Sequence, residues 1–338
     1  MRLVVVTQQV DPSSAVLGAT VDKLRALAAR VDELVVLADS AVDGALPANC
    51  RVRLFRSPLR AGRGLRFETA LARELVRRPR PVAVLAHMCP IYAVLAAPLA
   101  RPTGVKVMLW FTHWRRSRLL AAAAHASNIV LSVEERTFPL QTSKLVGIGH
   151  GIDVSAPQCV SRPEREPLTL LALGRTSPAK GLETIIRAVG RAKGVTLIVC
   201  GPSVTDEERL HRIALERFVI DEGVLDRVDI RGPAPRHTVP GLYAEVDVLV
   251  NNMRPGATDK VVYEAAATCM PVLASNPAFD TLLPPELRFE RDDVDGLAEA
   301  MRRLRRLDRN ALGQGLRETV VREHSVGVWA DHVVALAR

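Results

Sequence analysis

The sequence has few aromatic residues and no long apolar run, and each shortage excludes a class of protein. Aromatic side chains make up 4% of the 338 residues. No uninterrupted apolar run reaches the roughly 18 residues that a membrane-spanning helix needs. The N-terminal apolar stretch already turns polar at Gln8 and Gln9, so it lacks the apolar core and the cleavage site of a signal peptide. We therefore expect a cytoplasmic protein.

Cysteine is also scarce, and the five cysteines are scattered and odd in number. No two of them have the spacing of zinc ligands. Cys89, Cys200 and Cys269 lie in apolar stretches, which is typical of small core residues. We predict no disulfide framework and no zinc site, and the remaining cysteines, Cys50 and Cys159, do not change this prediction.

Positive charge is concentrated in the first half of the chain. Residues 1–160 hold 21 Lys and Arg and 11 Asp and Glu. Of the totals of 46 and 37, the rest of the chain therefore holds 25 Lys and Arg and 26 Asp and Glu. Residues 51–80 alone hold ten arginines and two glutamates. Such a basic face attracts anionic surfaces or substrates, although the preference for arginine is also what a GC-rich genome produces. Aromatic residues are not interleaved with the arginines, so we expect no nucleic-acid partner.

Apolar strands alternate with helical patterns in both halves of the chain, which predicts α/β architecture with parallel, doubly wound sheets. Strands are predicted at 3–7, 34–38, 52–55, 82–86, 106–111, 129–133, 145–148, 168–173, 195–200, 227–230, 247–250 and 271–274. Helices are predicted at 20–30, 68–78, 92–99, 181–191, 206–217, 239–244, 260–268, 297–307 and 326–337. The proline-rich stretch 154–167 reads as a linker. We therefore predict Rossmann-like domains at 1–153 and 168–322, followed by a C-terminal helix within 323–338.

The most informative stretch joins a predicted strand to a predicted helix. An apolar run ends in Gly174-Arg175, and a short polar loop leads to Lys180-Gly181, where the helix begins. Two cations at a helix start, beside its exposed N–H groups, favour binding of a diphosphate. The plainer alternative is an ordinary strand–loop–helix with two solvated cations.

This loop resembles the phosphate-binding loop of retaining glycosyltransferases with the GT-B fold, family four. The resemblance implies two Rossmann-like domains that face a central cleft, with a C-terminal helix that crosses back to the first domain. It assigns Gly174, Arg175 and Lys180 to the donor diphosphate. It also implies that no metal is needed, because the two cations take its place, and the sequence shows no acidic DxD pair in a suitable loop.

A second stretch, from residue 259 to residue 275, resembles the family's paired-glutamate element. Glu264 matches the second glutamate, which binds the ribose hydroxyls through two acceptor oxygens; a helix-surface glutamate is the alternative. The first glutamate would fall at Gly256, so recognition of the donor sugar departs from the family pattern. We predict that the same loop contacts the donor through Gly256, Ala257, Thr258, Asp259 and Lys260.

Further resemblances are spread over the first half and the middle of the chain. His113, in the run Trp110-Phe-Thr-His113-Trp114, matches the family histidine beside the donor sugar and acceptor, and Trp114, His87 and Gly18 are weaker acceptor-side candidates. The stretch 147–153 matches the family hinge; a linker follows it instead of a helix, so its glycines do not indicate a dinucleotide site. Gly201 lies where the family's base-binding loop begins.

These observations predict a glycosyltransferase that moves a sugar from a UDP- or GDP-linked donor to a glycan, lipid or small-molecule acceptor with retention. His113, Arg175, Lys180 and Glu264 are its predicted catalytic residues, and no cofactor or metal is expected. Two alternatives stay open: a catalytically degenerate nucleotide-sugar-binding protein, and a non-transferring nucleotide-sugar enzyme of the same fold. The basic region 51–80, with Arg115, Arg116 and Arg118, suggests a peripheral contact with anionic lipid at the inner face of the membrane.

Overall fold

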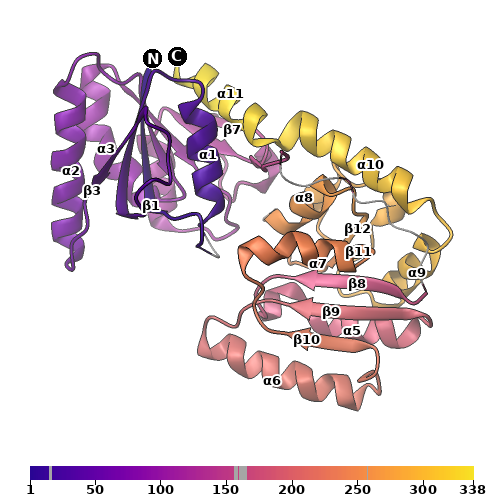
Figure 1. The fold of residues 1–338 in the computed structure, drawn as a ribbon. Coiled ribbons are helices and arrows are strands. Elements are labelled where there is room, and N and C mark those ends of the chain that lie inside the picture. The colour runs from indigo at the N-terminus through magenta and orange to yellow at the C-terminus, as the bar shows by residue number, and fades with distance from the viewer. Residues whose placement is uncertain (15–16, 156–158, 160–165, 257) are drawn as a thin grey trace. The chain divides into compact units, whose positions relative to one another are not determined.

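The computed structural model describes residues 1–14, 17–155, 159, 166–256 and 258–338, and the chain divides into two compact units (Figure 1). The first unit comprises Met1–Asp153 together with Glu323–Arg338, and the second comprises Val154–Arg322. Each unit is built on its own parallel sheet, of seven strands in the first and five in the second.

The first unit has the strand order β3-β2-β1-β4-β5-β6-β7, and its ladders are all parallel. The central strands are almost entirely apolar because helices cover both faces of the sheet. Helices α2, α3 and α4 pack on one face, whereas α1 and α11 pack against each other. The elements are β1 (Arg2–Val10), α1 (Ala19–Ala28), β2 (Glu33–Ala41), β3 (Cys50–Leu54), α2 (Arg60–Val76), β4 (Ala83–His87), α3 (Pro90–Ala100), β5 (Lys106–Trp110), α4 (Arg118–Ala126), β6 (Ile129–Ser132), β7 (Leu145–Gly147) and α11 (Val326–Ala337).

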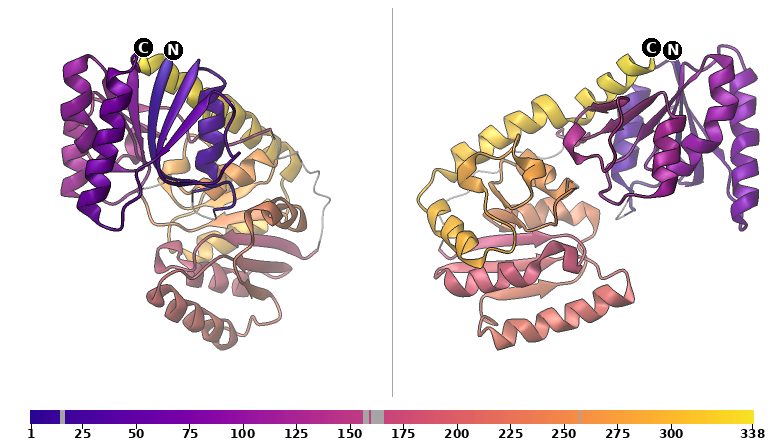
Figure 2. Two further views of the ribbon diagram at one scale, coloured as in Figure 1. Left: turned by 60° about the vertical axis from the view of Figure 1, so that its left-hand side comes forward. Right: turned by 180° about the vertical axis from the view of Figure 1, so that it is seen from behind.

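The second unit has the strand order β10-β9-β8-β11-β12, also parallel throughout. Both views of Figure 2 show its helices on the two sides of the sheet. The elements are β8 (Leu168–Leu173), α5 (Leu182–Arg191), β9 (Val195–Cys200), α6 (Asp206–Asp221), β10 (Val228–Arg231), α7 (Val239–Glu245), β11 (Val248–Asn251), α8 (Lys260–Ala267), β12 (Val272–Ala274), α9 (Val294–Leu304) and α10 (Arg309–Thr319).

The C-terminal tail belongs to the first unit although the second unit precedes it in the chain. A π-helical turn (Val320–His324) leads from α10 into α11, where Trp329 packs edge-on against Trp110, with ring centroids 5.6 Å apart. The loop after β7 accommodates this tail through glycines. A Cβ on Gly149 would overlap the Glu323 carbonyl oxygen, and one on Gly151 would lie 2.8 Å from Cε of Lys23.

The α/β fold class is confirmed by the two parallel sheets. Two helices were not predicted, α4 and α10, and α2 begins eight residues before its predicted start at 68. The prediction of no disulfide was wrong, because Cys159 and Cys269 are bonded across a sequence separation of 110. Within the described ranges, no helix is long and apolar enough to cross a membrane.

Candidate functional site

The predicted phosphate loop lies at the carboxyl end of β8, where glycines let two backbone segments approach closely. Gly174 adopts a φ of +130°, and a Cβ there would lie 2.7 Å from Nζ of Lys180. A Cβ on Gly201, which follows β9, would overlap the Gly174 carbonyl oxygen. The Gly174 N–H donates to the Cys200 carbonyl oxygen at 2.9 Å. Glycine is therefore required at both positions to keep the loop ends of β8 and β9 together.

Lys180 lies in a small network with residues that follow β11. It ends the short 3₁₀ helix Pro178–Lys180, and its ammonium forms an ion pair with Asp259. Asn251 donates through Nδ2 to the same carboxylate at 2.8 Å, and Nζ of Lys180 lies 3.4 Å from the Leu173 carbonyl oxygen. The lysine head group is thus held in place by groups from β8, β11 and the start of α8.

Arg175 is paired with a residue that the sequence analysis did not single out. Nη2 of Arg175 lies 2.5 Å from Oε1 of Glu208, in the first turn of α6. The other oxygen of Glu208 accepts from the N–H groups of Val204 and Thr205, at 2.7 and 3.2 Å. Thr205 and Glu208, three residues later, form a capping box. This spacing of residue types can be recognised in the sequence.

The ionisation of Glu208 reflects these contacts. Burial by itself raises the pKa of Glu208, but the hydrogen bonds from Arg175 and from the two backbone N–H groups outweigh it. Its pKa therefore lies below the ordinary value, so Glu208 is a fixed anion beside Arg175 at neutral pH.

Helix α8 carries Glu264, which the resemblance matches to the second glutamate of the paired-glutamate element. Oε1 of Glu264 lies 2.7 Å from Nζ of Lys260, one turn earlier, and the glutamate side chain is 27% exposed. Glu264 is therefore accessible to a ligand and not enclosed in the core. Thr258 is buried, and Ala257 lies outside the described residues.

The backbone conformation at position 256 favours the glycine found there, where the resemblance would place a glutamate. Gly256 has a φ of +104°, which a glutamate could adopt only with strain. The N–H of Arg254 in the same loop donates to the Ala179 carbonyl oxygen at 2.9 Å, so this loop lies beside the phosphate loop.

The structure brings part of the predicted donor set of the second unit together. Gly174, Arg175 and Lys180 line one small pocket with Asn251 and Asn252, and Asp259 joins it through its ion pair with Lys180. Three cations of this region each pair with a carboxylate: Arg175 with Glu208, Lys180 with Asp259, and Lys260 with Glu264. Each of these three ion pairs carries no net charge.

His113 lies in an exposed loop after β5 in the first unit. Its ring stacks on Trp114, with centroids 5.4 Å apart and planes at 24°. The Arg115 N–H donates to Nδ1 of His113 at 3.0 Å. With Nδ1 acting as acceptor, the neutral imidazole carries its proton on Nε2, which makes that nitrogen a hydrogen-bond donor.

The other acceptor-side candidates occupy less accessible positions. His87 ends β4 and is 6% exposed, and neither ring nitrogen has a hydrogen-bond partner in the described part of the chain. Burial, and then the nearby charge of Lys23, lowers the pKa of His87 to about 3. Gly18 is buried and precedes α1 with a φ of −55°, a conformation open to any residue.

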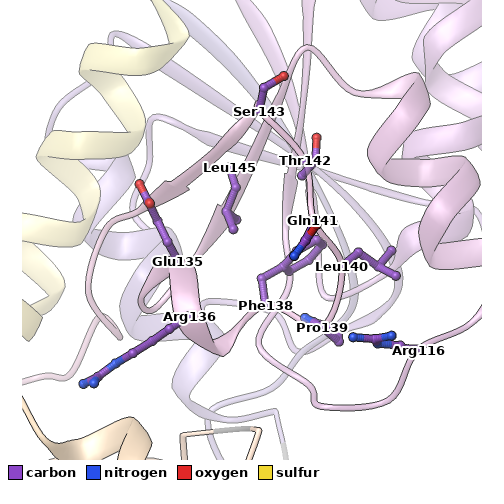
Figure 3. A pocket seen from close by; sticks show the side chains of 10 residues that line it. All are labelled: Arg116, Glu135, Arg136, Phe138, Pro139, Leu140, Gln141, Thr142, Ser143 and Leu145. Carbon is purple, nitrogen blue, oxygen red and sulfur yellow. The ribbon is translucent and has the colours of Figure 1, made fainter.

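A larger cavity of about 710 Å³ lies in the first unit, beside β7 (Figure 3). Phe138, Leu140 and Leu145 supply its apolar lining. Glu135 and Arg136 extend away from Arg116 instead of converging with it. Of the residues that line this cavity, only Arg116 was singled out from the sequence. In the residues that the structure describes, no three His, Cys, Asp or Glu side chains are grouped to hold a metal.

Comparisons with known proteins find similarity in the second unit and in the fold. Residues 167–306 match the family model described as glycosyl transferases group 1. A stretch of 104 residues is 32% identical to the D-inositol 3-phosphate glycosyltransferase of Mycobacteroides abscessus, covering 30% of this chain and 23% of that protein. The match thus spans less than a quarter of that relative's length.

Solved structures resemble the whole chain. Sucrose-phosphate synthase from Thermosynechococcus elongatus has a TM-score of 0.77 at 17% identity, covering 99% of this chain and 98% of its own. Anabaena HepE in complex with UDP has a TM-score of 0.77 at 15% identity, covering 99% of both chains. A glycosyltransferase from Rickettsia africae has a TM-score of 0.78 at 14% identity, covering 99% of this chain and 97% of its own.

At these identities the structural likeness concerns the fold, whereas the family match covers the segment that builds the phosphate loop. Residues 167–306 therefore match the glycosyl transferases group 1 family model, and the chain as a whole has the GT-B fold of its structural neighbours.

Proposed function

We propose that the chain is a metal-independent, retaining glycosyltransferase that transfers a hexose from a UDP- or GDP-linked donor. The observation that carries the proposal is the grouping of Arg175 and Lys180 at one pocket, with Glu264 on the adjoining α8. HepE was solved with UDP and with UDP-glucose, which favours a uridine donor as the first to test.

The proposed chemistry follows from these charges. Arg175 and Lys180 bind the diphosphate and stabilise the negative charge that develops on it as the glycosidic bond breaks. Glu264 accepts hydrogen bonds from the vicinal ribose hydroxyls. We assign His113 to the reaction centre, where its Nε2–H can donate to a sugar hydroxyl and Trp114 offers an aromatic face. The acceptor is a glycan, a lipid or a small molecule.

The test is UDP binding by calorimetry, and transfer from UDP-glucose, for Arg175→Ala and Lys180→Ala. We expect each variant to weaken UDP binding at least about tenfold, because each removes a charged donor. Transfer should fall by about 10²–10³, as for other lost electrostatic contacts to a transition state. Arg187→Ala is the matched control, because Arg187 also pairs with a glutamate and is similarly exposed, 49% against 52% for Arg175. Wild-type-like UDP affinity in both site variants would refute the assignment.

The second candidate is a nucleotide-sugar-binding protein without transferase activity, which the glycine at position 256 favours. A protein that binds UDP-sugars, loses that binding in Arg175→Ala, and transfers to no member of a broad acceptor panel would establish this candidate. Steady hydrolysis or epimerisation of the donor would instead identify a non-transferring enzyme.

We also propose a peripheral contact between α2 and an anionic membrane, at its cytoplasmic face. Leu59, Leu65 and Val76 are exposed on or beside this helix, among arginines such as Arg60 and Arg73. Each basic residue near an anionic leaflet contributes about 1 kcal/mol. We expect sedimentation with phosphatidylserine vesicles at low salt and none with neutral vesicles. Equal recovery in both pellets would contradict an electrostatic contact.

A further inference from the structure

The cavity beside β7 has the size of a small-molecule site and lies at the edge of the sheet where ligands bind. Its volume of about 710 Å³ falls within the roughly 300–1,000 Å³ of known ligand pockets. Arg116 follows the carboxyl end of β5, and Glu135 follows that of β6. Open α/β sheets bind their ligands outside the carboxyl ends of the strands. The cavity is therefore a candidate binding site within the first unit.

The wall of the cavity that joins β6 to β7 is held at both of its ends. At one end Phe138 is buried, and its ring packs edge-on against Phe111. At the other end Nζ of Lys144 donates to the carbonyl oxygens of His125 and Ser127, at 2.6 and 2.8 Å. These contacts tie the wall to β5 and to the end of α4, so the cavity is part of the fold of the first unit.

The charge in this cavity favours an anionic ligand. In the described part of the chain, Arg116 forms no ion pair, whereas Nε of Arg136 lies 2.7 Å from Oε2 of Glu134. Figure 3 shows Arg116 on the other side of the cavity from Glu135, the acidic residue of the lining. A guanidinium binds a carboxylate or a phosphate through two parallel hydrogen bonds. Arg116 is thus available to bind such a group.

The same cavity offers an apolar surface beside this cation. Leu140 and Leu145 line it and are only partly buried, so a ligand can cover them further. Each methylene group of a ligand that is buried in this way strengthens binding about fourfold. Gln141 and Thr142, also in the lining, provide hydrogen-bonding groups. This lining suits a molecule in which an anionic group lies next to an apolar part.

The cavity adjoins the histidine that we assign to the reaction centre. The ring of Phe111 lies between the two, with its centroid 6.2 Å from that of Phe138 and 6.4 Å from that of His113. His113 and Arg116 belong to the same loop after β5, three residues apart. A ligand bound to Arg116 therefore lies near His113.

We propose that this cavity binds the acceptor, and that the acceptor is an anionic amphiphile. It carries a hydroxyl group, a phosphate or carboxylate that binds Arg116, and an apolar part that packs on Leu140 and Leu145. This inference rests on the proposed transferase function, because it narrows the acceptor of that reaction to one chemical class.

Calorimetric titration of the full chain with simple amphiphiles, in the absence of a donor, tests the proposal. Hexyl phosphate should bind, and butyl phosphate should bind about tenfold more weakly because it has two fewer methylene groups. Inorganic phosphate lacks the apolar part and hexyl glucoside lacks the charge, so each should bind at least about tenfold more weakly than hexyl phosphate. Heptanoate replaces the phosphate by a carboxylate, and the tighter of the two ligands identifies the anionic group.

Arg116→Ala should weaken hexyl phosphate binding at least about tenfold, because it removes the charged donor. Arg118→Ala is the matched control: Arg118 is also exposed and lies two residues further on, but it does not line the cavity. It should bind hexyl phosphate like the wild type. Leu140→Ser should reduce the difference between hexyl and butyl phosphate. Circular dichroism verifies that each variant is folded.

The phosphate loop provides the decisive comparison, because it is the other place where a phosphate is expected to bind. Arg175 lies in the second unit, so Arg175→Ala should bind hexyl phosphate like the wild type. Loss of binding in Arg175→Ala but not in Arg116→Ala would overturn the proposal, as would a wild type that binds hexyl glucoside as tightly as hexyl phosphate. A wild type that binds neither hexyl phosphate nor heptanoate would also overturn it. The donor assignment is tested separately, by UDP binding.

Discussion

At the scale of single residues, carboxylates neighbour both cations of the phosphate loop, and under the proposed function they determine how strongly the loop would attract a diphosphate. Asp259 is bonded to Lys180 and to Asn251, whereas Glu208 is bonded to Arg175 and caps α6. A diphosphate bound as we propose would compete with both carboxylates for the same ammonium and guanidinium groups. Their negative charges therefore lower the affinity that two isolated cations would have.

Asp259→Asn tests this competition. Two like charges about 5 Å apart repel by about 3 kcal/mol at an effective dielectric constant of 20. This repulsion exceeds the conformational entropy that the Lys180 side chain, less ordered without its partner, would give up on binding UDP. We therefore expect Asp259→Asn to bind UDP more tightly, by about tenfold in calorimetry. The gain should be smaller with UDP-glucose if Asp259 also contacts the donor sugar. Weaker UDP binding would show instead that Asp259 serves to hold Lys180 in place.

The buried His87 should make the stability of the first unit depend on pH. Its pKa falls from an ordinary value of 6.5 to about 3 in the folded chain, so between these values only the unfolded state binds the proton. Stability is therefore fully present above pH 6.5 and is lost as the pH falls below it, at up to about 1.4 kcal/mol per pH unit.

The measurement is urea unfolding at several pH values, followed by tryptophan fluorescence, because all three tryptophans lie in the first unit. Between pH 6.5 and about pH 4, the free energy of unfolding of His87→Gln should fall less steeply with falling pH than that of the wild type. The two slopes should differ by about 1.4 kcal/mol per pH unit. His125→Gln, at an exposed position in the same unit, is the control. An identical slope in wild type and His87→Gln would mean that His87 charges in the folded state.

At the scale of the elements, the site depends on how closely β8 and β9 approach at their carboxyl ends. Gly174 and Gly201 touch backbone to backbone, and the loop that follows places Arg175 and Lys180. The side chains that we propose bind a donor are thus positioned by two glycines.

Gly201→Ala should destabilise the second unit, by at least about 2 kcal/mol, because a new Cβ overlaps a backbone oxygen that cannot move independently of its strand. Gly232→Ala is the control, because a Cβ there meets nothing within 4 Å. Circular dichroism during urea unfolding should register the loss for Gly201→Ala, whereas tryptophan fluorescence, which reports the first unit, should not change. Equal stability of the two variants would contradict this account.

At the scale of the whole molecule, the chain leaves the first unit at Asp153 and returns to it at Glu323. The returning helix completes a buried cluster in which Nζ of Lys23 lies 6.0 Å from the Trp110 ring centroid and 5.6 Å from that of Trp329. The ammonium also donates to the Gly151 carbonyl oxygen at 3.1 Å. The first unit is therefore incomplete without the last residues of the chain.

Trp329→Ala should lower the stability of the first unit by about 3–5 kcal/mol, the usual cost of removing a fully buried large aromatic side chain. Fluorescence of Trp110 and Trp114 during urea unfolding would report it. His332→Ala, at an exposed position on the same helix, should leave the midpoint unchanged. A first unit that unfolds at the wild-type midpoint in Trp329→Ala would show that α11 adds little to it.

The sequence by itself determined the features that depend on neighbouring residues. Alternating apolar strands and helical patterns predict two parallel sheets, and the glycine–arginine and lysine–glycine pairs mark the loop that we propose binds phosphate. Each such signal spans only one strand, turn or helix. The Thr205–Glu208 capping box was equally local.

Only the tertiary structure decided which distant residues meet. Arg175 pairs with Glu208, Lys180 pairs with Asp259 across 79 residues, and Cys159 bonds to Cys269 across 110. Such partners are set by strand order and crossover connections, which no local pattern encodes. For the same reason the burial of His87 followed from what packs around the end of β4, and not from the residues beside it in the chain.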